Sequence, residues 1–363
     1  SCRFIVNFWK LFGHLQSITM QQAYYKPATP YNIFSIGAGG IVKDAHLPAY
    51  QIAGYFVKGI YDIDHSKAQL LAKSFNIPAV FESLDGIIAA ANENAIFDIA
   101  LPASAIIEVL QKLPIGAAVL LQKPMGSSLA EAKEIVALVE SKKFIAAVNF
   151  QLRYAPFMLA AKKIMDAHHF GPISDIEIAV NVHTPWSLWT FLQTAPRLEI
   201  LYHSIHYIDL IRNLLGNPAS VYAKTVKHPT QMALASVKST IIMDYGDTVA
   251  VSIKTNHCHD YADTHQDAFI KIEGTNGAIK INLGLLKNYP IGAADRFEYI
   301  IKELGTNASW KKVDVEGSWF PHAFIGSMAE IMKTLDGVIE SPDNNVHDVL
   351  ATMAVSYTHL TLP

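Results

Sequence analysis

Short apolar runs alternate with amphipathic segments over the first 150 residues. Five apolar runs are predicted to be buried strands, at 31–36, 55–61, 95–101, 117–121 and 144–150. Apolar positions at helical spacing predict helices between them, at 41–51, 66–75, 105–113 and 128–141. Because strands that alternate with helices form parallel sheets covered on both faces, this half is predicted to be an α/β domain of the doubly wound Rossmann type.

The pattern changes near residue 150. Two helices are predicted, at 156–168 and 205–215, and a long alternating strand at 174–182. Five more strands are expected downstream, at 220–225, 236–244, 248–255, 268–273 and 278–283. Since these strands carry one polar face, they predict a large open sheet that is mostly antiparallel. We therefore expect a Rossmann domain at 20–150 and a second α/β domain at 151–354.

Both ends of the chain differ from the rest. Residues 1–19 precede Met20 and include an apolar stretch too short to span a bilayer, so we interpret them as a non-native upstream segment. A signal peptide is the alternative interpretation. Residues 355–363 resemble a translated sequencing adaptor, and we expect them to be foreign to the fold.

Composition excludes some classes of partner. The formal net charge is -3 over 363 residues, which gives no basic surface for nucleic acid, and no segment predicts membrane insertion. Two cysteines cannot build a disulfide framework, so a cytoplasmic protein is expected. His257, His259 and His265 invite a metal interpretation, but no further ligand lies at close spacing. We expect these to be surface or interface histidines and predict no metal site.

A glycine-rich turn follows the first strand. Gly37-x-Gly39-x-x-Val42 keeps two of the three glycines of the dinucleotide fingerprint, and Gly40 adds flexibility. The first glycine allows a tight turn and the second lets the backbone approach a pyrophosphate. Asp62, at the end of the next strand, is placed to bind ribose hydroxyls. No lysine or arginine occurs at 63–66 to hold a 2′-phosphate, so NAD is favoured over NADP.

A single lysine ends the fourth strong apolar run. Gln122-Lys123-Pro124 follows Leu121, and proline stops the strand there. Open α/β sheets bind ligands at the carboxyl ends of their strands, so Lys123 is expected to face a nicotinamide ring. The predicted cofactor-binding residues are Gly37, Gly39, Gly40, Ile41, Asp62, Pro102, Gln122 and Lys123.

In this order and spacing, these residues resemble the Gfo/Idh/MocA oxidoreductases, from about residue 31 to 354. Further marks are Arg153 and the sequence His206-Tyr207-Ile208-Asp209 at the start of a helix. The resemblance implies hydride transfer between NAD(P) and a sugar, polyol or related hydroxy compound. It also implies a C-terminal α/β domain whose open sheet is buried in a homodimer or homotetramer.

Three positions depart from the family pattern. The family's Glu-Lys-Pro is Gln122-Lys123-Pro124, a histidine after the fourth strand is Ile106, and the aspartate four residues before the family histidine is Tyr202. The lysine and the final histidine, His206, are present. The site is therefore expected to hold fewer carboxylates than those of its relatives.

The chemistry assigns roles to the predicted site. By family position His206 is the candidate base, since imidazole titrates near working pH, and Lys123 would stabilise charge on the reacting oxygen. Tyr202 would relay a proton or line the site, with a core tyrosine as the alternative. Candidate substrate-binding residues are Arg153, Trp186, His203 and Asp209.

The expected function is an NAD-dependent oxidoreductase acting on a sugar, polyol or sugar acid. Two alternatives use the same fold, because fold alone does not fix function. One is a non-catalytic regulatory protein that binds NAD and sugar. The other is NAD-assisted glycoside cleavage, in which hydride transfer is transient.

Overall fold

A six-stranded parallel sheet forms the N-terminal half of the protein. The computed structural model describes residues 18–20, 23–91, 94–167, 169–188, 190–195, 197–289, 292–302 and 307–358. The strand order is β4-β3-β2-β5-β6-β7, and every neighbouring pair is parallel. The strands are β2 (Asn32–Ile36), β3 (Phe56–Tyr61), β4 (Ala79–Val80), β5 (Ala95–Ile99), β6 (Ala118–Leu121) and β7 (Ile145–Val148). The prediction of a doubly wound sheet is confirmed.

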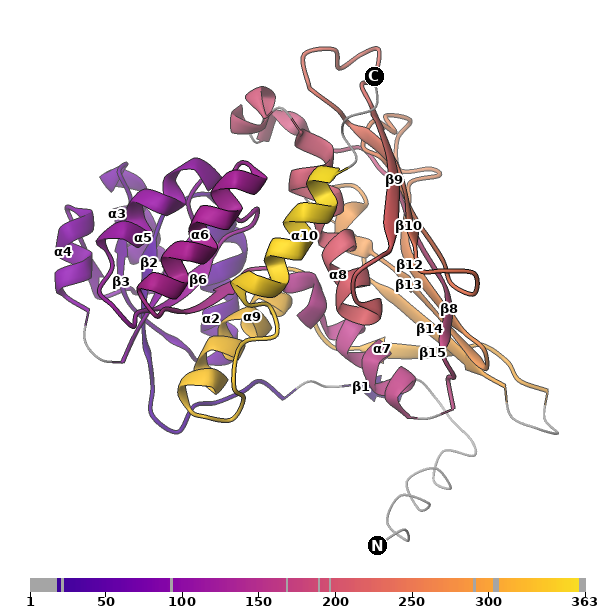
Figure 1. The fold of residues 1–363 in the computed structure, drawn as a ribbon, viewed down its shortest axis with the longest axis horizontal. Coiled ribbons are helices and arrows are strands. Elements are labelled where there is room, and N and C mark those ends of the chain that lie inside the picture. The colour runs from indigo at the N-terminus through magenta and orange to yellow at the C-terminus, as the bar shows by residue number, and fades with distance from the viewer. Residues whose placement is uncertain are drawn as a thin grey trace, which may run out of the picture.

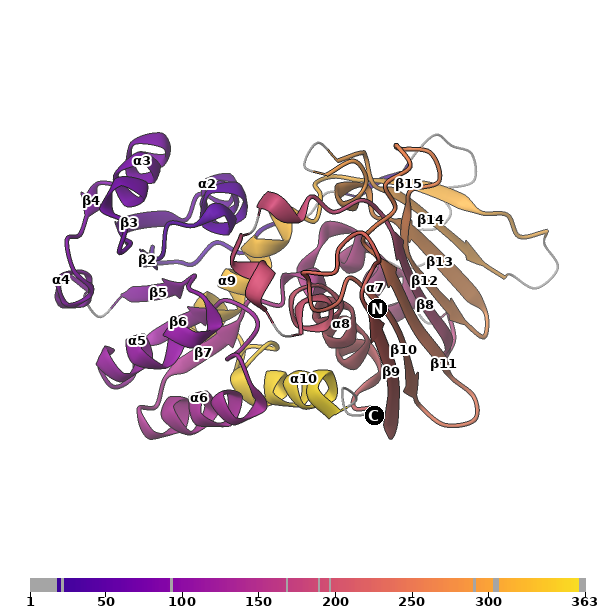
Figure 2. The ribbon, with the colours of Figure 1, turned by 90° about the horizontal axis from the view of Figure 1, so that it is seen from above.

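Helices connect these strands on both faces (Figures 1 and 2). They are α2 (Leu47–Ala53), α3 (His65–Phe75), α4 (Leu84–Ala89), α5 (Ile106–Lys112) and α6 (Leu129–Ser141). Ser128 caps α6, its hydroxyl accepting the N–H of Glu131 at 3.1 Å. The helix α4 and the short strand β4 were not predicted.

The helix predicted at 41–51 is interrupted. A π-helical turn, η1 (Val42–His46), precedes α2, and Pro48 lies in the first turn of α2. Proline has no N–H to donate, so it is tolerated at a helix start and not in a helix interior. His46, the last residue of the π-helical turn, is fully buried and contacts Asp98 of β5, which matters for the site described below.

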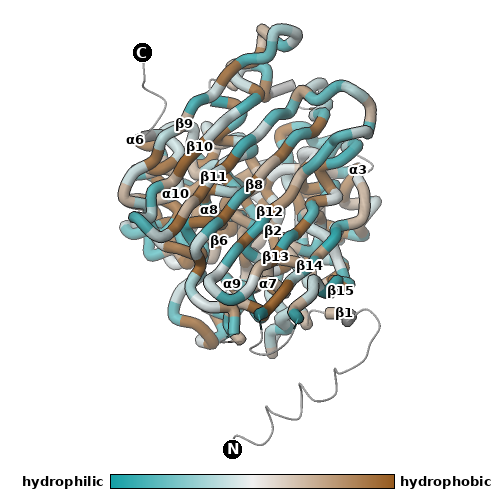
Figure 3. Tube along the Cα trace, turned by 90° about the vertical axis from the view of Figure 1, so that its right-hand side faces the viewer, coloured by the Kyte–Doolittle hydropathy of each residue, from teal (hydrophilic) through white to brown (hydrophobic). Residues whose placement is uncertain are grey.

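A nine-stranded sheet forms the second half, in the order β1-β15-β14-β13-β12-β8-β11-β10-β9. Among the described strands of this second sheet, only β1–β15 and β8–β11 are parallel pairs, so the sheet is mostly antiparallel, as predicted. The strands are β1 (Ile18–Met20), β8 (Ile173–Asn181), β9 (Ser220–Val226), β10 (Lys238–Asp244), β11 (Ala250–Asn256), β12 (Asp267–Gly274), β13 (Gly277–Asn282), β14 (Arg296–Ile301) and β15 (Lys311–Val315). Along these strands hydrophobic and hydrophilic residues alternate (Figure 3), as expected for a sheet with one buried face.

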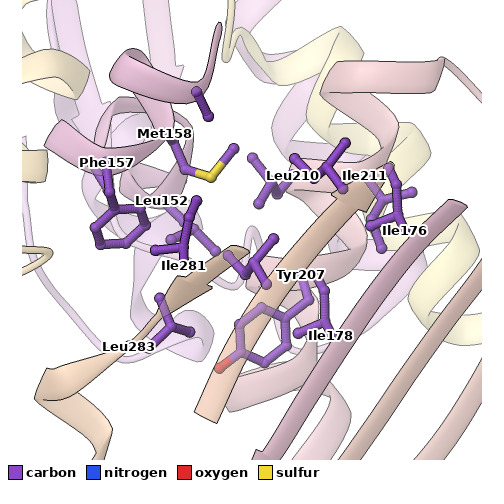
Figure 4. Close-up of a cluster of buried hydrophobic side chains, with 14 of the residues drawn as sticks. Leu152, Phe157, Met158, Ile176, Ile178, Tyr207, Leu210, Ile211, Ile281 and Leu283 are labelled. Atoms are coloured by element: carbon purple, nitrogen blue, oxygen red, sulfur yellow. The ribbon is translucent and has the colours of Figure 1, made fainter. Parts of the chain in front are cut away.

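Two helices cover the buried face of this sheet. They are α7 (Pro156–Asp166) and α8 (Ile205–Leu215), and α8 has the predicted bounds because Gly216 ends it with φ +78°. Figure 4 shows side chains of both helices meeting strand residues such as Ile178 and Ile281, which are fully buried. This core fixes the start of α8, and with it the histidines that precede and begin that helix.

The C-terminal segment returns to the parallel sheet through two helices that the pattern did not predict. They are α9 (His322–Leu335) and α10 (Val346–Thr358). Phe324 and Met328 of α9 lie in one core with the parallel sheet, and Val349 of α10 lies in the core on the other side. In Figures 1 and 2, α10 lies between the two sheets. The two halves are therefore joined by buried apolar contacts.

Most of the segment 1–19, and the last five residues of 355–363, lie outside the described residues. The strand β1 pairs with β15 in parallel, with Ile18 opposite Val313. Within the described ranges, no helix is both long enough and apolar enough to cross a bilayer.

Candidate active site

Lys123 lies just past the carboxyl end of β6. The apolar residues of β6 are buried, which fixes the strand and holds Lys123 at the sheet edge. Its Nζ donates a hydrogen bond to the backbone carbonyl of Tyr202 at 2.9 Å, and lies 5.9 Å from the centre of the Tyr202 ring. Burial lowers the pKa of the Lys123 amine to about 8. This amine can therefore change charge near neutral pH.

His206 is in the first turn of α8 and is 6% exposed. Its ring meets Phe150 and Trp319 edge to face, at 6.1 and 5.6 Å between centroids. Burial, and then the positive charge of Lys123, hold the pKa of His206 well below its usual range. The imidazole is therefore neutral at pH 7 and can accept a proton.

Tyr202 and His203 belong to a second π-helical turn, η6 (Ile200–Ser204), which leads into α8. Burial raises the pKa of the Tyr202 phenol, so it stays protonated at neutral pH. For His203 the pKa falls well below its usual range, through burial first and then the charges of His257, Lys123 and His206. These two residues thus present a phenol and a neutral imidazole beside Lys123.

An aromatic cluster adjoins His203. Trp186 meets the rings of His203 and His257 edge to face, at 5.1 and 5.6 Å, and those two imidazoles lie 4.4 Å apart. Thr184 Oγ1 is 2.9 Å from Nδ1 of His257. The predicted substrate residues Trp186 and His203 are therefore brought together with Lys123 and His206.

We expected His257 at the surface or in an interface. That expectation is wrong, because His257 is only 2% exposed within the chain. His257 directly follows β11, and its ring packs against His203 in the aromatic cluster. Its Nε2 lies 3.5 Å from Oε1 of Glu199, a fully buried carboxylate that also accepts the Ser204 hydroxyl at 2.7 Å. These hydrogen bonds, with the charge of His257, outweigh burial and lower the pKa of Glu199. Sequence reasoning missed Glu199, a charged residue in an apolar stretch.

The glycine turn has the shape a dinucleotide needs. Gly37 has φ +113°, and a Cβ there would lie 2.5 Å from the carbonyl oxygen of Ala100, so glycine is required. A Cβ on Gly39 would meet no atom within 4 Å, so the backbone at this position is open to close approach. The carboxylate of Asp62 accepts the N–H groups of Ala38 and Asp64 at 2.6 and 2.8 Å. The residues present fit a bound dinucleotide.

The other predicted cofactor positions border this turn. Ile41 packs partly against the core of the parallel sheet, and Pro102 follows β5 at the same edge as Lys123. Ile106, where the family has a histidine, is fully buried among apolar side chains. That position therefore belongs to the core in this protein.

A buried network lies beneath Gln122, and sequence reasoning missed two of its members. Asp98 Oδ2 is 2.8 Å from Nδ1 of His46, and Nε2 of His46 is 3.3 Å from Nε2 of Gln122. Gln122 Oε1 in turn accepts the backbone N–H of Lys123 at 2.8 Å. Asp98 and His46 are fully buried. The available signal was a lone aspartate inside the apolar run at 95–101.

Arg153 and Asp209 bind each other instead of projecting toward Lys123. Arg153 donates to both oxygens of Asp209 at 2.6 Å, and both side chains are almost completely buried. Arg153 also binds Asp348 and the carbonyl of Asp343, and Thr352 of α10 donates to Asp209. This network ties α8 to α10 and engages both side chains in an ion pair, so neither belongs to the proposed substrate site. Among the described residues, no cluster of His, Cys, Asp and Glu is arranged to hold a metal ion.

Comparison with known proteins matches both halves of the chain. Residues 31–150 match the oxidoreductase family with an NAD-binding Rossmann fold, and residues 158–280 match the GFO/IDH/MocA C-terminal domain. An uncharacterized protein of Saccharomyces cerevisiae is 26% identical over 268 residues, 70% of this chain and 75% of the relative. Glucose-6-phosphate 3-dehydrogenase of Bacillus subtilis is 28% identical over 240 residues, 61% of this chain and 67% of that enzyme.

Solved structures share the fold. An oxidoreductase from Agrobacterium radiobacter, in complex with NAD+, L-tartaric acid and magnesium, superposes with a TM-score of 0.74 at 20% identity, covering 91% of this chain and 95% of that one. The two family matches follow each other along the chain, one over the parallel sheet and the other over much of the second sheet. The protein therefore belongs to the Gfo/Idh/MocA family of oxidoreductases.

Proposed function

We propose that the protein is an NAD-dependent oxidoreductase that transfers hydride between nicotinamide and a hydroxyl or carbonyl of a sugar, polyol or sugar acid. The observation that carries the proposal is the place of Lys123 at the carboxyl edge of the parallel sheet, where its amine binds the carbonyl of Tyr202 in the turn that leads to His206. Similarity to glucose-6-phosphate 3-dehydrogenase supports a sugar-like substrate.

Bound NAD would supply the hydride acceptor or donor. Gly37, Gly39 and Gly40 would let the turn approach the pyrophosphate, and Asp62 would accept ribose hydroxyls in place of backbone N–H groups. Lys67, the nearest cation after Asp62, forms an ion pair with Asp64 at 3.3 Å. A carboxylate at this position disfavours a 2′-phosphate, which is the basis for proposing NAD over NADP.

In alcohol oxidation, His206 would accept the hydroxyl proton, because its lowered pKa keeps the imidazole unprotonated. Lys123 in its charged form would donate a hydrogen bond to the same oxygen and stabilise its developing negative charge. Tyr202, a protonated phenol beside Lys123, would bind a neighbouring substrate oxygen.

The remainder of the substrate would contact the aromatic cluster. Trp186 offers an indole ring and His203 a neutral imidazole, a combination suited to the apolar faces and the hydroxyls of a sugar. This placement would explain how a site with few carboxylates binds an uncharged polyhydroxylated molecule.

We also propose that the open face of the nine-stranded sheet joins two copies of the chain. Tyr222 and Ile242 are cross-strand partners on β9 and β10, and both are more than half exposed. Adjacent exposed apolar side chains on the open face of a sheet support an interaction surface there.

The test is NADH fluorescence during incubation with NAD and a panel of sugars, polyols and sugar acids. Accumulating NADH with at least one compound supports a dehydrogenase. Binding of NAD and sugar without turnover across the panel would instead favour a regulatory protein, and cleavage of a glycoside without net NADH would favour transient hydride transfer.

A further inference from the structure

A directional chain of hydrogen bonds runs from Asp98 to Lys123. Asp98, in β5, contacts Nδ1 of His46 at 2.8 Å, and Nε2 of His46 faces the amide nitrogen of Gln122 at 3.3 Å. The amide oxygen of Gln122 accepts the backbone N–H of Lys123 at 2.8 Å. His46 thus contacts residues 52 and 76 positions away in sequence and links β5 to the end of β6.

The two ends of this chain fix its polarity. The backbone N–H of Lys123 can only donate, so the oxygen of Gln122 must face it and the NH2 group must face His46. At the other end, Oδ2 of Asp98 accepts the hydroxyl of Tyr50 at 2.9 Å and offers the same oxygen as an acceptor to Nδ1 of His46 at 2.8 Å. His46 therefore donates from Nδ1 and accepts at Nε2, which is the arrangement of a neutral imidazole.

Other groups around His46 agree with this arrangement. The side-chain nitrogen of Asn149, just past β7, lies 3.2 Å from the same Nε2 and provides a second donor to it. Phe324 of α9 packs on the ring at 5.0 Å, and Tyr50 meets it edge on at 6.2 Å. Among the described residues in contact with His46, Asp98 and Tyr50 are the titratable ones.

We infer that His46 is a positioning residue for Lys123, acting through Gln122 as a neutral imidazole with its proton on Nδ1. The catalytic role of Lys123 rests on the proposed function, whereas the directions of the hydrogen bonds do not. Asp98 orients the ring of His46, the ring orients the amide of Gln122, and the amide holds the backbone that carries the reactive amine.

The inference explains how the site tolerates glutamine before Lys123. A carboxylate at 122 would still accept the N–H of Lys123, but it has no hydrogen to offer Nε2 of His46. His46 would then have to gain a proton and donate from both nitrogens. The added negative charge at 122 and the added positive charge at 46 cancel, so the net charge beneath Lys123 is the same with either residue.

Three variants test this in the full-length protein: Gln122→Glu, His46→Gln, and the two combined. Imidazole 15N NMR of histidine-labelled protein, with the His46 signal assigned by its loss in His46→Gln, reports which nitrogen carries a proton. The 13Cε shift of Lys123 in lysine-labelled protein, assigned with Lys123→Arg, reports the pKa of the amine. Thermal unfolding of each variant verifies that it is folded.

In the wild type we expect a proton on Nδ1 of His46 and none on Nε2, and in Gln122→Glu a proton on both. The Lys123 pKa should stay the same in Gln122→Glu and rise by about one unit in the double variant, where no imidazole can take up the compensating proton. An Nε2–H tautomer in the wild type, or an equal rise in the single and double variants, would overturn the inference. These readouts need no substrate, so they decide the inference even if the sugar panel shows no turnover.

Discussion

The side-chain amine of Lys123 donates a hydrogen bond to the backbone carbonyl of Tyr202, 2.9 Å away. Lys123 follows β6 of the parallel sheet, whereas Tyr202 lies in the π-helical turn that precedes α8. One contact therefore links the proposed cofactor half of the site to the proposed substrate half. A charged amine has three hydrogens, so this bond directs Lys123 and leaves donors for a substrate oxygen.

The pH dependence of turnover should report the charge of Lys123. Its pKa of about 8 means that the amine is charged below that pH and loses its charge as the pH rises through it. His206 is already neutral at pH 7 because its pKa is lowered. We therefore expect kcat for alcohol oxidation to fall above about pH 8. In Lys123→Arg the rate should be lower but the alkaline fall should move to higher pH, because arginine stays charged. An unchanged fall in the arginine variant would assign it to another group.

Removing either proposed catalytic side chain should abolish most turnover. Lys123→Ala and His206→Ala are each expected to lower kcat at least ~100-fold, the typical loss for a positioned acid–base group. His203→Asn serves as the matched control, because His203 is half-buried in the adjacent turn and is proposed to bind substrate: KM should rise more than kcat falls. Kinetics at saturating NAD separate the two effects. Near wild-type kcat in either alanine variant would remove that residue from the mechanism.

The sequence predicted the fold class because strand and helix periodicities are local signals. The bounds of α8 were correct since a glycine ends it, and the bounds of the strands differed by a few residues. The sequence pattern did not predict the short elements α4, β4 and β1, the strands β14 and β15, or the following features. The helices α9 and α10 carry apolar faces whose partners lie in the first half of the chain. The π-helical turn at 42–46 has no local signal in the sequence apart from Pro48, which follows it in the first turn of α2.

Contacts between residues far apart in sequence explain which parts of the site could not be predicted. The contact between His46 and Asp98 spans 52 residues, and no local pattern indicates that a histidine and an aspartate will meet. The same holds for Arg153 and Asp209, 56 residues apart, whose residue types suit a substrate carboxylate as well as each other. His257 is buried by Trp186 and His203, whose rings come from other segments of the chain.

Asp62 should set the preference for NAD. Its carboxylate lies at the end of β3 beside the glycine turn, where it would bind ribose hydroxyls and repel a 2′-phosphate. Asp62→Ser is expected to raise KM for NAD about tenfold and to improve the ratio of NADP to NAD use. Asp64→Ser is the control, because Asp64 is partly exposed and pairs with Lys67. A clear preference of the wild type for NADP would contradict the assignment.

The pair of Arg153 and Asp209 should matter for stability. Both side chains are buried, so Arg153→Met would leave the Asp209 carboxylate without its cation, at a cost of about 3–5 kcal/mol. Combining Arg153→Met with Asp209→Leu should recover part of that loss, because no unpaired charge remains. Urea unfolding measures both, and Arg296→Met, which breaks the exposed pair with Glu298, should change little. Loss of turnover without loss of stability would instead place Arg153 in substrate binding.

The exposed pair of Tyr222 and Ile242 should decide the oligomeric state. These side chains are 52% and 53% exposed and lie opposite each other on β9 and β10. If two copies meet through this face, placing Lys at 222 and Glu at 242 would put charges into a dry interface and shift the protein toward monomers. Light scattering after size exclusion measures the mass. Val338→Lys, at a 60% exposed residue after α9, should leave the mass unchanged. A monomeric wild type, or an assembly that survives the Tyr222→Lys/Ile242→Glu change, would mean that this face is not the interface.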